Sequence, residues 1–159
     1  MDMDFSQLFA MIVIPAILAL TGGFMLLMGI RNRNKAEHAT GWFPATGEVT
    51  AVSLKRHYRK GGVDYEPRVE YTYTIMGSPY AGKTFCFGTL RTTQAKAQAK
   101  LAAYPLHGRI VVYYNPDKPT DSVLEREAPG AVGMIIGGGL IILTGVALLI
   151  LPYLTTINW

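Results

Sequence analysis

One segment of the chain matches a phosphate-binding pattern letter for letter. Residues 77–84 read Gly-Ser-Pro-Tyr-Ala-Gly-Lys-Thr, which satisfies G-x-x-x-x-G-K-[ST]. In a working loop of this kind, backbone amides hold the phosphates, the lysine reaches the terminal phosphates, and the hydroxyl residue binds Mg²⁺ where a helix begins. Here Pro79 removes one amide donor, and the residues after Thr84 have the pattern of a strand. We therefore expect Gly77–Thr84 to form a hairpin turn, with nucleotide binding as the weaker alternative.

The densest run of positive charge is Lys-Arg-His-Tyr-Arg-Lys at residues 55–60. Its cations Lys55, Arg56, Arg59 and Lys60 could contact an anionic membrane surface or an acidic protein, and each basic residue near anionic lipid adds about 1 kcal/mol. They could equally form a solvated hairpin tip, because exposed tips are often basic for solubility. Nucleic acid is the least favoured partner, since Tyr58 is the only aromatic residue inside the run.

The other chemistry-bearing residues form no recognisable catalytic or metal-binding set. His38, His57 and His107 have no ligand-like spacing to one another or to Cys86. Cys86 stands between two phenylalanines, an environment typical of an unreactive buried thiol. No serine lies in a nucleophile-elbow pattern, and the acidic residues are scattered. We expect a protein that is not an enzyme and that uses no cofactor or metal.

Two uncharged apolar runs flank the polar part of the chain. Leu8 to Ile30 contains 23 residues without a charge, and Ala131 to Leu151 contains 21. At about 1.5 Å of rise per residue, each run can cross a hydrocarbon core of roughly 30 Å as a helix. The sequence thus predicts transmembrane helices at 8–30 and 131–151, with an N-terminal tail at 1–7 and a C-terminal tail at 152–159.

The charge distribution predicts which side of the bilayer holds the middle of the chain. All 15 Lys and Arg residues lie between Arg31 and Arg126. Because basic residues near span ends are retained in the cytoplasm, we expect a cytoplasmic central domain and both termini outside. The N-terminus lacks the basic region of a signal peptide. Trp42, just after the first span, is expected at headgroup level.

Small residues recur at helical spacing in both spans. Gly133, Gly137 and Gly145 share one helix face, and Ala19 and Gly23 form a similar pair in the first span. Small residues let helix backbones approach closely in lipid. The favoured interpretation is that the two helices of one chain pack together, and the alternative is a seam between copies in a homo-oligomer.

The polar middle has the pattern of a small α+β domain at 46–126, preceded by a spacer at 31–45. Alternation of apolar and polar residues around Val69–Ile75 indicates a half-buried strand. A helix ending at Pro105 would bury Ala97, Leu101 and Tyr104 on one face. The order β-β-β-α-β-β favours a mostly antiparallel sheet. The expected elements are strands at 48–57, around 69–75 and at 83–87, a helix at 92–104, and strands at 109–114 and 122–124.

Several segments together resemble a known bacterial family. Gly-Glu-Val at 47–49 follows Trp42 at the start of the domain, Tyr-Glu-Pro-Arg-Val-Glu-Tyr-Thr-Tyr occupies 65–73, and Val-Tyr-Tyr-Asn-Pro-Asp-Lys-Pro occupies 112–119. With the flanking spans, this pattern resembles domain-of-unknown-function family 3592. The resemblance implies a two-helix protein of the bacterial inner (plasma) membrane with a small β-rich domain, and it supplies no catalytic residues.

These observations favour a non-enzymatic function at a membrane. We expect an interaction or scaffold module that displays its β-rich domain at the membrane surface, with membrane lipids and a protein partner or second copy as contacts. One alternative is an immunity or envelope-stress protein that acts against a membrane-acting toxin. The other is a nucleotide-binding domain at Gly77–Thr84.

Overall fold

The structure is a computed structural model that describes residues 5–156, with side chains described for residues 11–150. The tails expected at 1–7 and 152–159 therefore lie partly outside the described residues. The chain divides into two compact units, one made by the chain up to Arg31 together with the chain from Ala131 onward, and one made by Asn32–Gly130. The elements in chain order are α1 (Phe5–His38), the 3₁₀ turn η1 (Ala39–Gly41), β1 (Phe43–Arg59), β2 (Gly62–Ile75), β3 (Ser78–Gly82), α2 (Gln94–Ala102), β4 (Arg109–Asn115), β5 (Lys118–Val123) and α3 (Ala131–Thr156).

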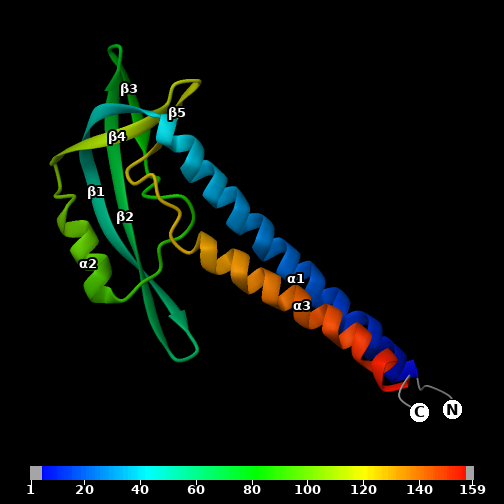
Figure 1. Cartoon of the computed structure of the whole chain (residues 1–159). Helices are drawn as coiled ribbons and strands as arrows, with labels where there is room; N and C mark the ends of the chain where they lie inside the picture. The colour runs from blue at the N-terminus through cyan, green and yellow to red at the C-terminus, as the bar shows by residue number, and fades with distance from the viewer. Residues whose placement is uncertain (1–4, 157–159) are drawn as a thin grey trace. The chain divides into compact units, whose positions relative to one another are not determined.

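The first unit is a pair of helices, α1 and α3, that lie side by side (Figure 1). Both are long and apolar enough to cross a membrane, as the sequence predicted. Many large apolar side chains on them are exposed, among them Leu20 and Leu143. Contiguous exposed apolar surface of this kind is disfavoured in water and suits a hydrocarbon solvent.

Glycines form the seam where α1 and α3 meet. A Cβ built on Gly138 would lie 2.6 Å from the carbonyl oxygen of Gly22, and one built on Gly145 would lie 3.3 Å from Leu18 Cβ. Added Cβ atoms on Gly23 and Gly133 would meet nothing within 4 Å, and one on Gly137 only the end of a methionine side chain. The seam within one chain thus runs through Gly22, Gly138 and Gly145, while Ala19 is exposed.

The second unit is built on a five-stranded sheet of order β3-β2-β1-β4-β5, in which all neighbouring strands are antiparallel. The prediction of an α+β fold with a mostly antiparallel sheet is confirmed. β1 is the central strand, because its first part pairs with β4 and its second part pairs with β2. A bulge at Thr50 interrupts the pairing of β1 with β2, just after the last residue that pairs with β4, and an extra residue of this kind bends a strand. Gly47 lies in the tight part of the bend, where a Cβ would meet Thr72 and Val112.

The two edges of the sheet meet and close it into a barrel. The segments that follow β3 and β5 run parallel and are joined by Leu124 N–H to Thr84 O (3.2 Å), Glu125 N–H to Phe85 O (2.8 Å) and Phe87 N–H to Glu127 O (2.9 Å). Tyr73 of β2 also donates from its hydroxyl to the Pro119 carbonyl in β5, at 2.6 Å. A five-stranded Greek-key barrel with its helix between the third and fourth strands has the connectivity of the OB-fold.

The barrel interior is filled from alternate positions of its strands. Val49, Val69, Tyr71 and Val112 are fully buried there. α2 covers one side of this core, with Ala97 buried and Leu101 and Tyr104 packed against it, as its apolar face predicted.

Two segments differ from the sequence-based expectation. Residues 31–45, expected to be a spacer, contain the last turns of α1, η1 and the start of β1. Here Ala39 is buried in a second small cluster with Phe87 and Val123, so packing keeps the segment helical. The strand expected at 83–87 is wrong, because β3 occupies Ser78–Gly82 and the phenylalanines after it turn into the core instead of alternating.

A single arginine joins the two ends of this unit. Arg126 donates from Nη1 to the carbonyl oxygens of Thr40 (2.9 Å) and Ala39 (3.5 Å), just after the end of α1. Its guanidinium also lies 4.0 Å from the centre of the Tyr113 ring, a cation–π distance. The point where the chain enters the barrel unit is thereby held beside the point where it leaves.

Candidate functional site

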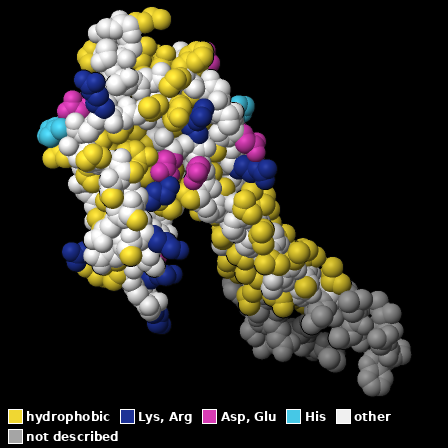
Figure 2. All heavy atoms as spheres, turned by 60° about the vertical axis from the view of Figure 1, so that its left-hand side comes forward, with side chains coloured by type: hydrophobic (Ala, Val, Ile, Leu, Met, Phe, Trp, Pro, Cys, Tyr) yellow, Lys and Arg dark blue, Asp and Glu magenta, His cyan; other side chains and the backbone are white. Residues whose placement is uncertain are grey.

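The predicted basic residues are brought together at the end of a long hairpin. We call residues 53–68 the arm: it consists of the distal halves of β1 and β2, joined by a two-residue turn between Arg59 and Gly62. Lys55, Arg56, Arg59 and Lys60 are all exposed on it. Lys and Arg side chains gather at the lower end of the domain in Figure 2. The arm contains five Lys and Arg residues and two acidic residues, a difference of +3.

Acidic side chains neutralise one face of the arm. Glu66 accepts hydrogen bonds from His57 Nε2 (2.6 Å) and Arg68 Nε (3.0 Å), and Arg59 pairs with Asp64 at 3.0 Å. Although burial raises the pKa of the Glu66 carboxyl, the hydrogen bonds from His57 and Arg68 outweigh it and hold that pKa below its ordinary value. This carboxylate is therefore a fixed part of the arm's structure.

The opposite face of the arm combines free cations with exposed apolar groups. Strand alternation places Arg56, Tyr58 and Val63 on this face, and Tyr58 is 79% exposed. Arg56 on this face and Lys60 in the turn have no carboxylate oxygen within 4 Å among the described residues. Lys55 has none either, but it lies on the acidic face, opposite Glu66. A surface with cations around an exposed tyrosine is suited to an anionic, partly apolar partner such as a lipid headgroup layer.

The segment that matches the phosphate-binding pattern has the wrong structure for that chemistry. Met76 and Gly77 both have positive φ, 49° and 84°, and form the two-residue turn between β2 and β3. Ser78–Gly82 is β3, and the structure has no helix between Thr84 and the start of α2 at Gln94. The backbone amides therefore belong to a hairpin and do not converge at a helix N-terminus, where a phosphate would bind.

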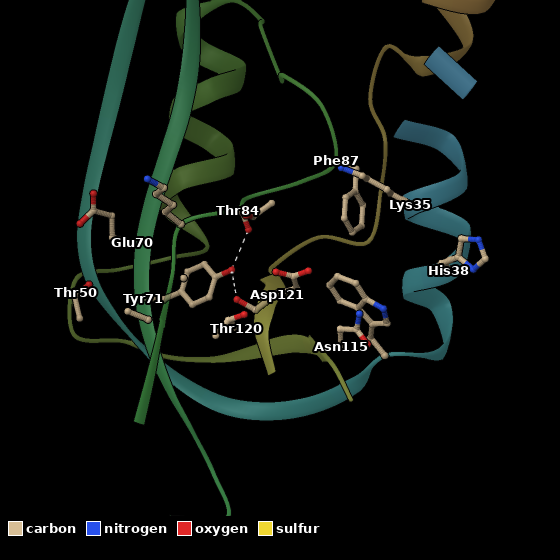
Figure 3. Close-up of a pocket in the computed structure, with 15 residues that line it drawn as sticks. Lys35, His38, Thr50, Glu70, Tyr71, Thr84, Phe87, Asn115, Thr120 and Asp121 are labelled. Atoms are coloured by element: carbon tan, nitrogen blue, oxygen red, sulfur yellow. Dashed lines mark hydrogen bonds between the residues drawn. The ribbon is translucent and has the colours of Figure 1, made fainter. Parts of the chain in front are cut away.

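A cavity of about 740 Å³ lies in the barrel unit, within the size range of small-molecule sites. Its wall is formed by the last turns of α1, by β5, by parts of β1, β2 and β4, and by the end of β3 with the residues up to Phe87 that follow it. Figure 3 shows Lys35, Phe87 and Asp121 directed toward a common space, with His38 and Glu70 directed away from it. Sequence reasoning assigned no role to Lys35 or Asp121. Their spacing in the sequence could not have identified them, because the lining residues come from six separate segments.

Buried polar groups close the floor of this cavity. The Tyr71 hydroxyl is 3.1 Å from both the Thr84 carbonyl oxygen and Ser122 Oγ (Figure 3). Burial raises the pKa of Tyr71 to about 12, so this hydroxyl stays protonated. A Cβ on Gly82 would collide with the Tyr71 ring and with Ser122 Oγ, so a glycine is needed at this point of the wall. Trp42 packs edge-on against Phe87, with the ring centroids 5.7 Å apart.

The described cysteine and histidine side chains do not come together in one site. Burial, with Glu125 as a further cause, raises the pKa of the Cys86 thiol to about 11. His57 and His107 each pair with a glutamate, at 2.6 and 3.1 Å. Within the described part of the chain, no three His, Cys, Asp or Glu side chains are placed to hold a metal ion.

Comparison with known proteins identifies a family. No curated protein matches the chain. The family model described as "Domain of unknown function (DUF3592)" matches residues 45–129, which run from β1 to the end of the barrel unit. This match covers more than half of the chain, and it agrees with the resemblance carried by residues 65–73 and 112–119. The chain belongs to the DUF3592 family.

Proposed function

We propose that this chain is a membrane-anchored, non-enzymatic interaction module, which displays its barrel beside a bilayer and contacts anionic lipid headgroups through the arm. Two apolar helices supply the anchor, and the charge asymmetry of the chain favours the cytoplasmic side of a bacterial inner membrane. The observation that carries the proposal is the face of the arm on which Arg56 and Tyr58 are exposed together.

The energetics favour lipid over nucleic acid as the partner of the arm. Each basic residue at an anionic lipid surface contributes about 1 kcal/mol, so a few free cations suffice when the protein is already anchored and pays no further entropy for association. Single-stranded nucleic acid requires stacking platforms, and Tyr58 is the only aromatic side chain among residues 55–60. OB-fold barrels often bind ligands with the loop between their first two strands, which here is the tip of the arm.

The test places a fluorescent label at the tip of the arm in the full chain. Val63→Cys provides an exposed thiol on the same face and leaves Arg56 and Tyr58 in place. The native Cys86 should stay unlabelled because it is buried and its pKa is raised to about 11. The protein is reconstituted in nanodiscs of phosphatidylcholine, with or without phosphatidylglycerol, and labelled with an environment-sensitive maleimide. We expect the emission to shift to the blue only when phosphatidylglycerol is present.

A pair of matched variants separates contact by the arm from a general charge effect. Arg56→Gln with Lys60→Gln should abolish the shift, whereas Arg91→Gln with Lys96→Gln removes the same charge at other exposed positions and should preserve it. Identical emission in the two lipid mixtures, or equal loss in both double variants, would remove lipid contact from the proposed function.

A further inference from the structure

The cavity beside α1 carries a second inference, which concerns a different site from the arm. We propose that it binds the zwitterionic headgroup of a phospholipid of the phosphatidylethanolamine class, with the phosphate at Lys35 and the ammonium at Asp121. The inference depends on the proposed placement of Leu8–Ile30 in a bilayer. It adds a ligand that the basic arm would not select.

A lysine and an aspartate line different sides of this cavity. Lys35 comes from α1 and Asp121 from β5, and both line the cavity, Asp121 beside the Tyr71 hydroxyl and Lys35 beside Phe87 (Figure 3). Among the described residues, Lys35 has no carboxylate oxygen within 4 Å. Asp121 pairs with Lys118 at 3.1 Å, but that lysine is largely exposed, so water and a ligand can replace it at little cost.

The rest of the lining suits a primary ammonium group attached to a short apolar chain. Trp42 and Phe87 supply aromatic surface, which attracts a cation as well as methylene groups. Asn115, Thr120 and Ser122 add neutral hydrogen-bonding groups on the side of Asp121. An anion alone would satisfy Lys35 but leave Asp121 facing a like charge, so a zwitterion is the better match.

The covalent structure keeps the cavity within reach of the headgroup layer. Lys35 lies five positions after Ile30, the last residue of the apolar run, and both belong to α1. That distance is about 7.5 Å along a helix and at most about 18 Å in an extended chain. The headgroup layer extends about 5–7 Å beyond the hydrocarbon core on each side. Lys35 thus lies close to the outer edge of this layer when the segment is helical, and for this reason we take a lipid of the same bilayer as the ligand in preference to a free metabolite that carries the same two charges.

The test uses the tryptophan that lines the cavity as its probe. The chain contains two tryptophans, so Trp159→Phe leaves Trp42 as the only one. The full chain in maltoside micelles is titrated with short-chain phosphatidylethanolamine or with short-chain phosphatidylglycerol, and Trp42 emission is recorded. We expect a saturable change with the ethanolamine lipid and no saturable change with the glycerol lipid.

Variants connect the response to the two charges. Because a hydrogen bond to a charged group is worth more than a tenfold change in affinity, Lys35→Gln and Asp121→Asn should each weaken the apparent affinity about tenfold or more. Lys96→Gln and Asp117→Asn make the same changes at exposed positions outside the cavity and should leave it unchanged. Circular dichroism of each variant verifies that the fold is retained. Equal responses to both lipids, or equal affinities of the cavity variants and their controls, would overturn the inference.

Two soluble ligands decide the source of the headgroup. Glycerophosphoethanolamine should bind more weakly than the lipid, because it is not concentrated in the micelle. If it binds as tightly, the ligand is a free zwitterion and the lipid assignment is wrong. If inorganic phosphate alone produces the full response, the cavity is a simple anion site. The arm and the cavity have opposite lipid preferences, so the failure of one proposal is distinguishable from the failure of the other.

Discussion

At the residue scale, Glu66 shows how a surface hairpin can depend on one carboxylate. It receives hydrogen bonds from His57 on the partner strand and from Arg68 on its own strand, and its side chain is only 17% exposed. These partners lower its pKa from the ordinary value of 4.5. The ionised form is thus favoured by folding, and protonation removes that contribution.

The arm should consequently lose stability in acid. A carboxyl whose pKa is lower in the folded state contributes stability above its unfolded pKa, and this contribution disappears as the pH falls below 4.5 and through the folded value. Thermal unfolding followed by circular dichroism at about pH 6 and about pH 3 should show a smaller acid-induced decrease for Glu66→Gln than for the unchanged chain. Glu70→Gln, which alters an exposed residue on the same strand, should behave like the unchanged chain. An identical acid response in Glu66→Gln would contradict this account.

The residues of the cavity mark the limit of prediction from sequence at this scale. The basic cluster could be recognised because its members are neighbours in the chain, and Cys86 could be recognised from the phenylalanines on either side. Lys35 and Asp121 lie 86 positions apart and gain their relation only when α1 and β5 fold against the same wall. Residue types alone therefore did not indicate a zwitterion site.

At the scale of elements, two adjacent glycines of α3, Gly138 and Gly139, allow a substitution in the seam to be compared with one outside it. A Cβ on Gly138 would lie 2.6 Å from the Gly22 carbonyl oxygen and 2.9 Å from the Leu26 amide nitrogen, whereas a Cβ on Gly139 would meet nothing within 4 Å. Gly138→Ala should destabilise the pair by about 1–3 kcal/mol, the usual cost of overpacking. Gly139→Ala should have little effect on packing.

The measurement is thermal unfolding of the full chain in detergent, followed by the helical signal in circular dichroism. A lower midpoint for Gly138→Ala than for Gly139→Ala supports the seam within one chain. Equal midpoints would favour the alternative in which these small residues pack between copies, and crosslinking of Gly133→Cys, on an open position, would then test for a dimer.

Element order was predictable, and element boundaries were less so. Apolar and polar residues alternate from Val69 to Ile75, so this part of β2 had a clear signal of period two. β3 is short, contains Pro79 and lies at the edge, which weakens that signal, and the apolar run at 85–87 was mistaken for it. The end of α1 was missed because a run of charged residues resembles a spacer, although Arg33 and Glu37 pair one turn apart at 2.8 Å.

At the scale of the whole molecule, sequence patterns indicated an antiparallel sheet but not its closure. Closure depends on hydrogen bonds between 84–87 and 124–127, two irregular segments about 40 positions apart. Such contacts leave no periodic pattern in the sequence, because consecutive side chains in these segments are buried together and do not alternate between buried and exposed. The barrel, and the cavity beside it, could be recognised only in the folded chain.

The proposed function requires a definite compartment for the barrel, which one exposed position can test. Met76 is fully exposed in the turn between β2 and β3, and Cys86 is buried. In intact expressing cells, Met76→Cys should resist a membrane-impermeant maleimide and should react once the membrane is permeabilised. Rapid labelling of Met76→Cys in intact cells would place the barrel outside and contradict the cytoplasmic assignment.

The hydrogen bonds of Arg126 to the carbonyl oxygens of Ala39 and Thr40 hold the two ends of the barrel unit together, so that this unit forms a self-contained insert in the chain. The chain enters the barrel just after Ala39 and Thr40 and leaves it near Arg126. Because these residues are hydrogen-bonded to one another, the two ends of the insert are adjacent. A domain with adjoining ends can be exchanged for another, or for a short loop, without stretching the hairpin that carries it. The family match, at residues 45–129, begins and ends within this insert.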